Sequence, residues 1–160
     1  MRHLLQAAAL LLLTAPAHAE PRVQRFTCEI GDGRTRILPR AREENADDEI
    51  RCSATLRGLG GRSPGDLVAE VSLLPPAGSL RVVASDKLAP TGEADTADLR
   101  ALVLPHAAWI SAVDWRARPA PRLRLVLRIY DKPSPGQKRW RLVASGQLEL
   151  GRRKDTRSAR

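Results

Sequence analysis

Short apolar runs that alternate with polar residues recur along most of the chain. In the clearest of them, residues 122–130, every second residue is Leu or Ile, and most of the intervening residues are Arg. A period of two is typical of a β-strand with one buried and one exposed face. By the same pattern we expect strands at residues 22–30, 50–56, 67–74, 80–84 and 99–104, and over residues 140–150 either two strands or one strand bent at Gly146.

The pattern predicts an all-β chain with seven or eight short strands separated by turn residues such as Pro75, Pro76 and Gly78. The fold class that fits is a single antiparallel β-sandwich, immunoglobulin-like or similar, formed by residues 20–150. Three segments, residues 31–49, 85–98 and 105–121, are not predicted to be strands. The third of these could form one turn of helix. Because β-sandwiches serve many unrelated functions, the fold alone predicts no activity.

Two cysteines, Cys28 and Cys52, lie on the apolar sides of the first two expected strands. We expect them to form a disulfide that points into the core and joins neighbouring strands. Closing the loop between them would stabilise the fold by about 3 kcal/mol. A metal or redox site is the alternative, but the chain has no C-x-x-C motif and no histidine close to either cysteine.

The two ends of the chain are predicted to lie outside the domain. Residues 1–19 have the form of a signal peptide: Arg2 precedes an apolar stretch over residues 4–13, and an Ala-x-Ala cleavage site ends at Ala19. We therefore expect the protein in the periplasm, with secretion as the alternative. The apolar stretch is too short to span a bilayer. Residues 151–160 are rich in Arg and Lys and are expected to form a disordered basic tail.

The chain is basic, with 27 Lys and Arg against 18 Asp and Glu, a formal net charge of +9. Alternation places Arg122, Arg124 and Arg128 on one exposed sheet face, where Arg139 and Arg141 could join them. Such a face would attract an anionic partner. The alternative is a solvated outer face that discourages aggregation.

A second candidate binding segment combines Trp109, Trp115, Arg116 and Arg118 within residues 105–121. Trp and Arg are enriched at binding hot spots, so these four residues are candidates for a partner surface. The alternative is that the segment caps the core through Trp109, which would leave Trp115 as the more exposed indole.

The candidate catalytic and metal-ligating residues are few. After cleavage of the signal peptide His106 is the one remaining histidine, and no Gly-x-Ser-x-Gly motif is present. The acidic run over residues 43–49 lacks the spacing of a calcium loop. We therefore expect no enzymatic activity, no cofactor and no metal site.

These observations favour a non-enzymatic periplasmic protein that binds other proteins, as a subunit or accessory factor of a cell-envelope assembly such as a motility, transport or secretion machine. One alternative is a binding module for an anionic envelope ligand, namely lipopolysaccharide, another polysaccharide or an anionic lipid surface. Another is a secreted inhibitor that uses the loop over residues 31–49. We expect neither nucleic-acid binding nor a membrane span.

Overall fold

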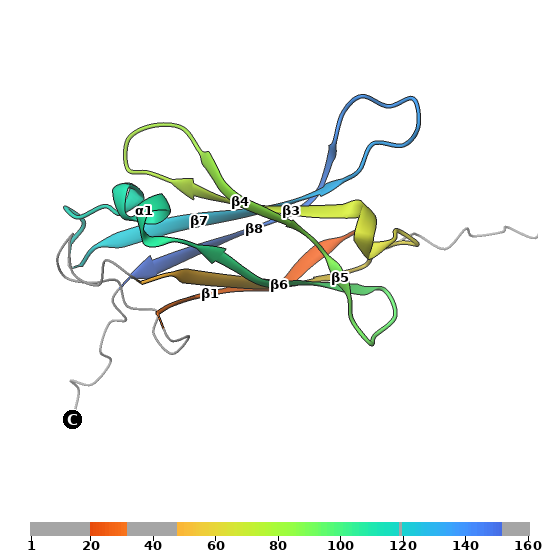
Figure 1. Ribbon diagram of the computed structural model, residues 1–160, viewed down its shortest axis with the longest axis horizontal. Coiled ribbons are helices and arrows are strands. Elements are labelled where there is room, and N and C mark those ends of the chain that lie inside the picture. Colours follow the sequence, from red (N-terminus) through yellow and green to blue (C-terminus); the bar gives the residue numbers. More distant parts are fainter. Residues whose placement is uncertain (1–19, 32–47, 119, 152–160) are drawn as a thin grey trace, which may run out of the picture.

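The computed structural model describes residues 20–31, 48–118 and 120–151, and within them two four-stranded antiparallel sheets face each other (Figure 1). The predicted all-β sandwich is confirmed. The expected signal peptide, most of the loop over residues 31–49 and all of the basic tail but Gly151 lie outside the described residues. The strands are β1 (Arg22–Ile30), β2 (Ile50–Arg57), β3 (Leu67–Leu74), β4 (Arg81–Lys87), β5 (Ala89–Pro90), β6 (Thr96–Leu104), β7 (Arg122–Asp131) and β8 (Arg141–Gly151).

The strand order is that of the immunoglobulin fold. Sheet A has the order β1-β2-β6-β5 and sheet B the order β4-β3-β7-β8. These orders correspond to the A-B-E-D and C′-C-F-G sheets of immunoglobulin domains. The chain passes from sheet B to sheet A between β4 and β5 through the single residue Leu88, which is buried.

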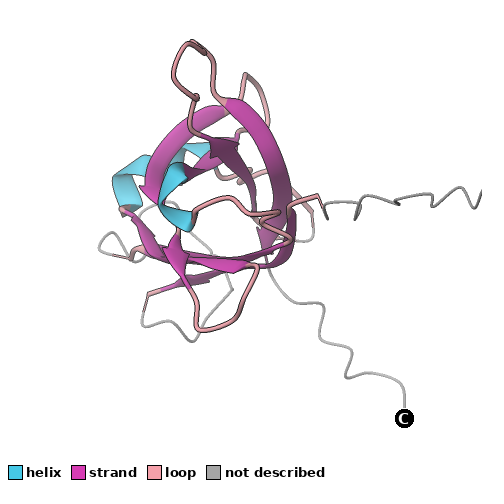
Figure 2. Ribbon diagram, turned by 90° about the vertical axis from the view of Figure 1, so that its right-hand side faces the viewer, coloured by secondary structure: helices cyan, strands magenta, loops and turns pink. Residues whose placement is uncertain are grey.

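The core consists mainly of aliphatic side chains from the inner faces of both sheets. Along β7 the predicted alternation holds, because Leu123, Leu125, Leu127 and Ile129 are all fully buried. Each such side chain contributes about 1.5 to 3 kcal/mol through its removal from water. Figure 2, which looks along the sandwich, shows the strands surrounding this core. β2, β3 and β6 contribute the same kind of residue, chiefly Ile50, Leu56, Leu67, Ala69, Val71, Leu73, Leu99 and Leu104.

The predicted disulfide is present and joins β1 to β2. Cys28 and Cys52 face each other directly in the antiparallel register, and neither is exposed. The bond therefore points into the core from the two neighbouring strands, as the sequence pattern indicated.

Residues 85–98 differ from the prediction of a loop. β4 continues to Lys87, β5 occupies Ala89–Pro90, and β6 begins at Thr96. The end of β4 lies at the edge of sheet B, where Ser85, Asp86 and Lys87 are all exposed. A strand with no buried residue over three positions gives no alternating pattern, which is why the sequence did not indicate it.

β8 is one continuous strand, and Gly146 does not bend it. The irregularity in its pairing with β7 lies near its start instead, at Val143, because Tyr130 pairs with Leu142 and Ile129 with Ala144. Gly146 has another role, because it lies where β8 passes close to β1. A methyl group on Gly146 would lie 3.4 Å from Cγ1 of Val23 and 3.8 Å from Cβ of Phe26.

Replacing both cysteines with alanine should lower the free energy of unfolding by about 3 kcal/mol, because the unfolded chain regains the freedom that the crosslink removes. Urea unfolding followed by circular dichroism measures this change. A reductant should lower the midpoint of the native protein and leave that of the C28A/C52A variant unchanged. Equal midpoints for the native protein and the variant without reductant would contradict the prediction.

At Gly146 the size of the new side chain should decide how much stability a substitution costs. Gly146→Ala places its methyl group at ordinary contact distance from Val23 and should be nearly neutral. Gly146→Val adds two further methyl groups against β1 and should cost roughly 1 to 3 kcal/mol through overpacking. Thermal unfolding of the two variants side by side tests this, and equal melting temperatures would show that β1 and β8 are not closely packed.

Candidate functional site

The outer face of sheet B is apolar at the end nearest the β7–β8 hairpin. In the strand register Val68 of β3 lies beside Tyr130 of β7, which in turn lies beside Leu142 of β8. Trp140, just before β8, joins them. Trp140 is 49% exposed and Leu142 is 51% exposed, although large hydrophobic residues are usually buried.

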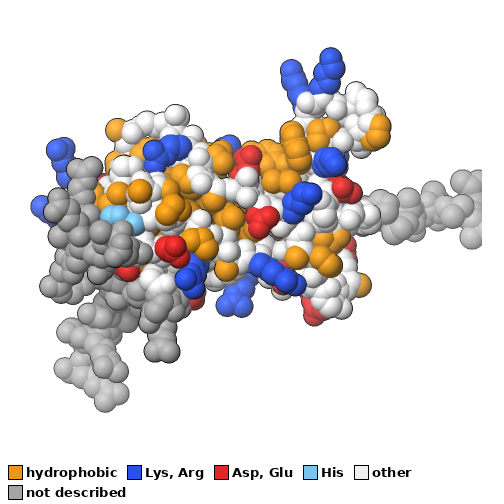
Figure 3. Space-filling view, viewed as in Figure 1, with side chains coloured by type: hydrophobic (Ala, Val, Ile, Leu, Met, Phe, Trp, Pro, Cys, Tyr) orange, Lys and Arg blue, Asp and Glu red, His pale blue; other side chains and the backbone are white. Residues whose placement is uncertain are grey.

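A hollow of about 320 Å³ opens on this face, lined by Val68, Glu70, Tyr130 and Trp140. We call these four residues the aromatic hollow. Two aromatic rings and one aliphatic side chain give it an apolar lining, with the Glu70 carboxylate as its charged group. In the space-filling view, hydrophobic side chains gather where the hairpin meets the body, and Lys and Arg side chains lie at the tip of the hairpin (Figure 3).

The sequence did not indicate this hollow. Val68 and Tyr130 are far apart in the chain and become neighbours only through the pairing of β3 with β7. One local signal was available: Trp140 follows Lys138 and Arg139 at the end of the hairpin loop, which is the same Trp-plus-basic composition that marked Trp109 and Trp115.

Sheet B carries two charged clusters, one on its outer face and one at the base of the β7–β8 hairpin, on the side of β7 opposite Tyr130. At the far end, Glu149 lies 3.3 Å from Arg122 and 3.8 Å from Arg124, so two guanidinium groups share one carboxylate. Arg122, Arg124 and Arg128 do lie on one outer face, in the places that alternation gave them. The three side chains of the Glu149 cluster are 45% to 63% exposed, so these ion pairs contribute little to stability.

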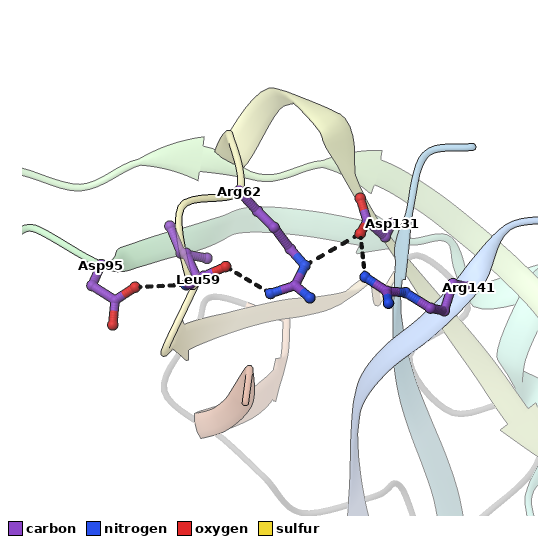
Figure 4. Close-up of polar contacts among 6 residues, drawn as sticks. Leu59, Arg62, Asp95, Asp131 and Arg141 are labelled. Atoms are coloured by element: carbon purple, nitrogen blue, oxygen red, sulfur yellow. Dashed lines mark hydrogen bonds and ion pairs between the residues drawn. The ribbon is translucent and has the colours of Figure 1, made fainter. Parts of the chain in front are cut away.

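The second cluster holds the base of the β7–β8 hairpin. Asp131 accepts a hydrogen bond from Nε of Arg62 at 3.2 Å and another from Arg141 at 3.0 Å (Figure 4). Arg62 also donates to the carbonyl oxygen of Leu59 at 2.8 Å. Asp131 thereby ties the loop between β2 and β3 to both strands of the hairpin that carries Trp140.

The backbone supports the same connection. The amide of Lys132 donates to the carbonyl of Asp66 at 2.9 Å, next to the short 3-10 helix η1 (Pro64–Asp66). Within the β2–β3 loop, the amide of Gly60 donates to the Asp95 carboxylate at 2.9 Å. The position of Trp140 is therefore set by a hydrogen-bonded base and not by the hairpin loop alone.

The segment with Trp109 and Trp115 packs largely against the core. It forms the short helices α1 (His106–Trp109) and η2 (Ile110–Ala112). Trp109 is fully buried, so the core-capping alternative describes it and it is not available to a partner. Trp115 is half-buried and packs against the same core, whereas Arg116 and Arg118 are exposed. The ring of His106 lies edge-on to Trp109, with centroids 4.9 Å apart.

A larger hollow, of about 570 Å³, lies on the outer face of sheet A and is polar. Several of its polar groups already bind one another: the hydroxyls of Thr27 and Ser53 lie 3.1 Å apart, and Thr55 donates to Asp98 at 2.8 Å. Groups that are satisfied in this way leave less for a ligand to gain. The aromatic hollow on sheet B is therefore the better candidate site.

Two further findings concern the described residues. They contain no group of three or more His, Cys, Asp or Glu side chains placed to hold a metal ion. None of the helices in these segments is long and apolar enough to cross a membrane.

Comparison of the chain with protein-family models, with curated proteins and with solved structures gave no match.

We predict that the charge of Asp131 stabilises the fold. Asp131→Asn keeps the shape of the side chain but removes the charge that both arginines share, and it should cost about 1 kcal/mol because Asp131 and Arg62 are mostly buried. Arg141→Gln is the matched control, since Arg141 is well exposed, and it should cost less than about 0.5 kcal/mol. Urea unfolding gives both values, and a larger loss for Arg141→Gln would contradict the assignment.

Proposed function

We propose that this protein is a non-enzymatic binding protein of the bacterial cell envelope. It acts there as a subunit or accessory factor of a larger assembly, and it contacts its protein partner through the outer face of sheet B. The periplasm is the proposed location, since the expected signal peptide would export the chain. The Cys28–Cys52 disulfide fits that location because disulfides persist in oxidising compartments.

The observation that carries the proposal is the exposure of Trp140 and Leu142 beside the aromatic hollow. Water-exposed indole and aliphatic surface is unfavourable in the free protein and becomes favourable once a partner covers it. Trp, Tyr and Arg are also the residues that dominate binding energy at protein interfaces, especially where they surround a pocket. All three types occur on this face, in Trp140, Tyr130 and Arg128.

A second candidate function is the binding of an anionic envelope ligand, such as lipopolysaccharide. The charged clusters support it, because two arginines share one carboxylate at both Glu149 and Asp131. The exposed aliphatic residues favour a protein partner instead. Leu142 on β8 and Val82 on β4 are each 51% exposed, and neither offers a hydrogen bond to a sugar or a phosphate.

Affinity purification from the native periplasm after mild crosslinking, with mass spectrometry of the recovered proteins, tests the proposal. The tag belongs at the C-terminus, because β8 runs away from the hairpin toward the opposite end of the sandwich (Figure 1). We expect a fixed set of envelope proteins with the native chain and a loss of about tenfold or more with Trp140→Ser/Leu142→Ser.

Val103→Ser is the matched control for this experiment. Val103 is 42% exposed but belongs to β6 in sheet A, on the other side of the molecule. The control should recover the same partners as the native chain. Equal losses for the control and the double variant, or no reproducible partner at all, would count against the proposal.

A further inference from the structure

Building on the proposed function, we infer that the aromatic hollow receives one apolar side chain from an acidic segment of the partner protein. Two features of the outer face of sheet B support this. One is the apolar hollow itself, and the other is the excess of positive charge around it.

The hollow is suited to an apolar anchor. Val68, Tyr130 and Trp140 line it from three different elements, namely β3, β7 and the end of the hairpin loop. A leucine or aromatic side chain placed between these groups would be removed from water on several sides at once. Such a central, desolvated anchor is the usual form of a binding hot spot.

The carboxylate in the hollow does not make the surroundings acidic. Glu70 stands directly opposite Arg128 in the register of β3 and β7. Opposite charges at facing positions of neighbouring strands attract each other, so this pair adds no net charge to the face. The charge that a partner meets is therefore set by the residues around the pair.

Those residues are mainly basic. Lys87 of β4 is exposed and stands directly opposite Val68 in the register of β3 and β4. Arg122 and Arg124 share the single carboxylate of Glu149 at the other end of the face, which leaves one positive charge in excess. The hairpin adds exposed basic side chains: Lys138 and Arg139 directly precede Trp140, and Lys132 lies at the start of the hairpin loop.

An acidic segment complements this arrangement. Carboxylates on either side of the apolar anchor would lie near Lys87, the basic hairpin residues and the Arg122–Arg124 pair, while the anchor itself fills the hollow. Charge complementarity of this kind speeds association and fixes the orientation of the partner. A basic segment would meet like charges on both sides of the hollow.

Synthetic peptides of about twelve residues test the inference directly on the purified protein. The acidic peptide carries Asp and Glu around a central Trp, the second replaces that Trp with Ser, and the third replaces each acid with Lys. Fluorescence anisotropy of the labelled peptides gives the dissociation constants. We expect the acidic Trp peptide to bind at least about tenfold more tightly than either of the others.

Two double variants locate the contact. Lys138→Ser/Arg139→Ser should weaken the acidic Trp peptide severalfold, whereas Arg25→Ser/Arg100→Ser removes the same charge from sheet A and should leave it unchanged. Raising the salt from about 0.1 M to about 1 M shortens the Debye length from about 10 Å to about 3 Å and should weaken binding to the native protein.

The peptide results test the anchor and the charge preference separately. Equal binding of the Trp and Ser peptides would overturn the anchor, and equal binding of the acidic and Lys peptides would overturn the charge preference. Failure of every peptide to bind, or binding of lipopolysaccharide alone at the same variants, would overturn the inference as a whole. A partner recovered from the periplasm with the native chain would still support the proposed function in each of these cases.

Discussion

The aliphatic side chains of β3 and β7 pack against those of β2 and β6, and the rest of the structure depends on this contact. Every second residue of these central strands points into the shared core. The arrangement fixes which residues face outward, because a shift of one position in register would exchange the two faces. The disulfide between β1 and β2 adds a covalent link within one sheet, and Trp109 closes the core with the one aromatic ring that is fully buried.

The candidate site is the outward side of the same central strands. Val68 and Glu70 alternate with buried Leu67, Ala69 and Val71 along β3, and Tyr130 follows buried Ile129 on β7. The floor of the aromatic hollow is therefore formed by strands whose other side is packed in the core. Its upper wall, Trp140, comes from a hairpin whose base is held by Asp131 and two arginines. A pre-ordered surface of this kind loses little conformational entropy when a partner binds.

The sequence predicted the parts of the fold that follow from local alternation. Residues 122–130 and the two cysteine strands have one apolar face each, and their places and the disulfide were predicted from that pattern. The end of β4 was missed because an edge strand without buried residues has no such pattern. Arg122, Arg124 and Arg128 lie on one face as predicted, but the ion pairs of Glu149 with two of them depend on strand pairing and are not local. Arg141 does not join that face, since it pairs with Asp131 on the opposite side. The same holds for the hollow, since strand pairing alone brings Val68 to Tyr130.

The two ends of the described fold leave it in opposite directions. β1 begins beside the hairpin end of the sandwich, and β8 ends at the other (Figure 1). A tension applied between Arg22 and Gly151 would therefore act along the strands and shear the β1–β2 and β7–β8 ladders. The disulfide prevents β1 from sliding past β2, whereas hydrogen bonds and packing alone hold β8 to β7. Because β8 carries both Leu142 and the core residue Leu150, the proposed contact surface and the core depend on the same uncrosslinked strand.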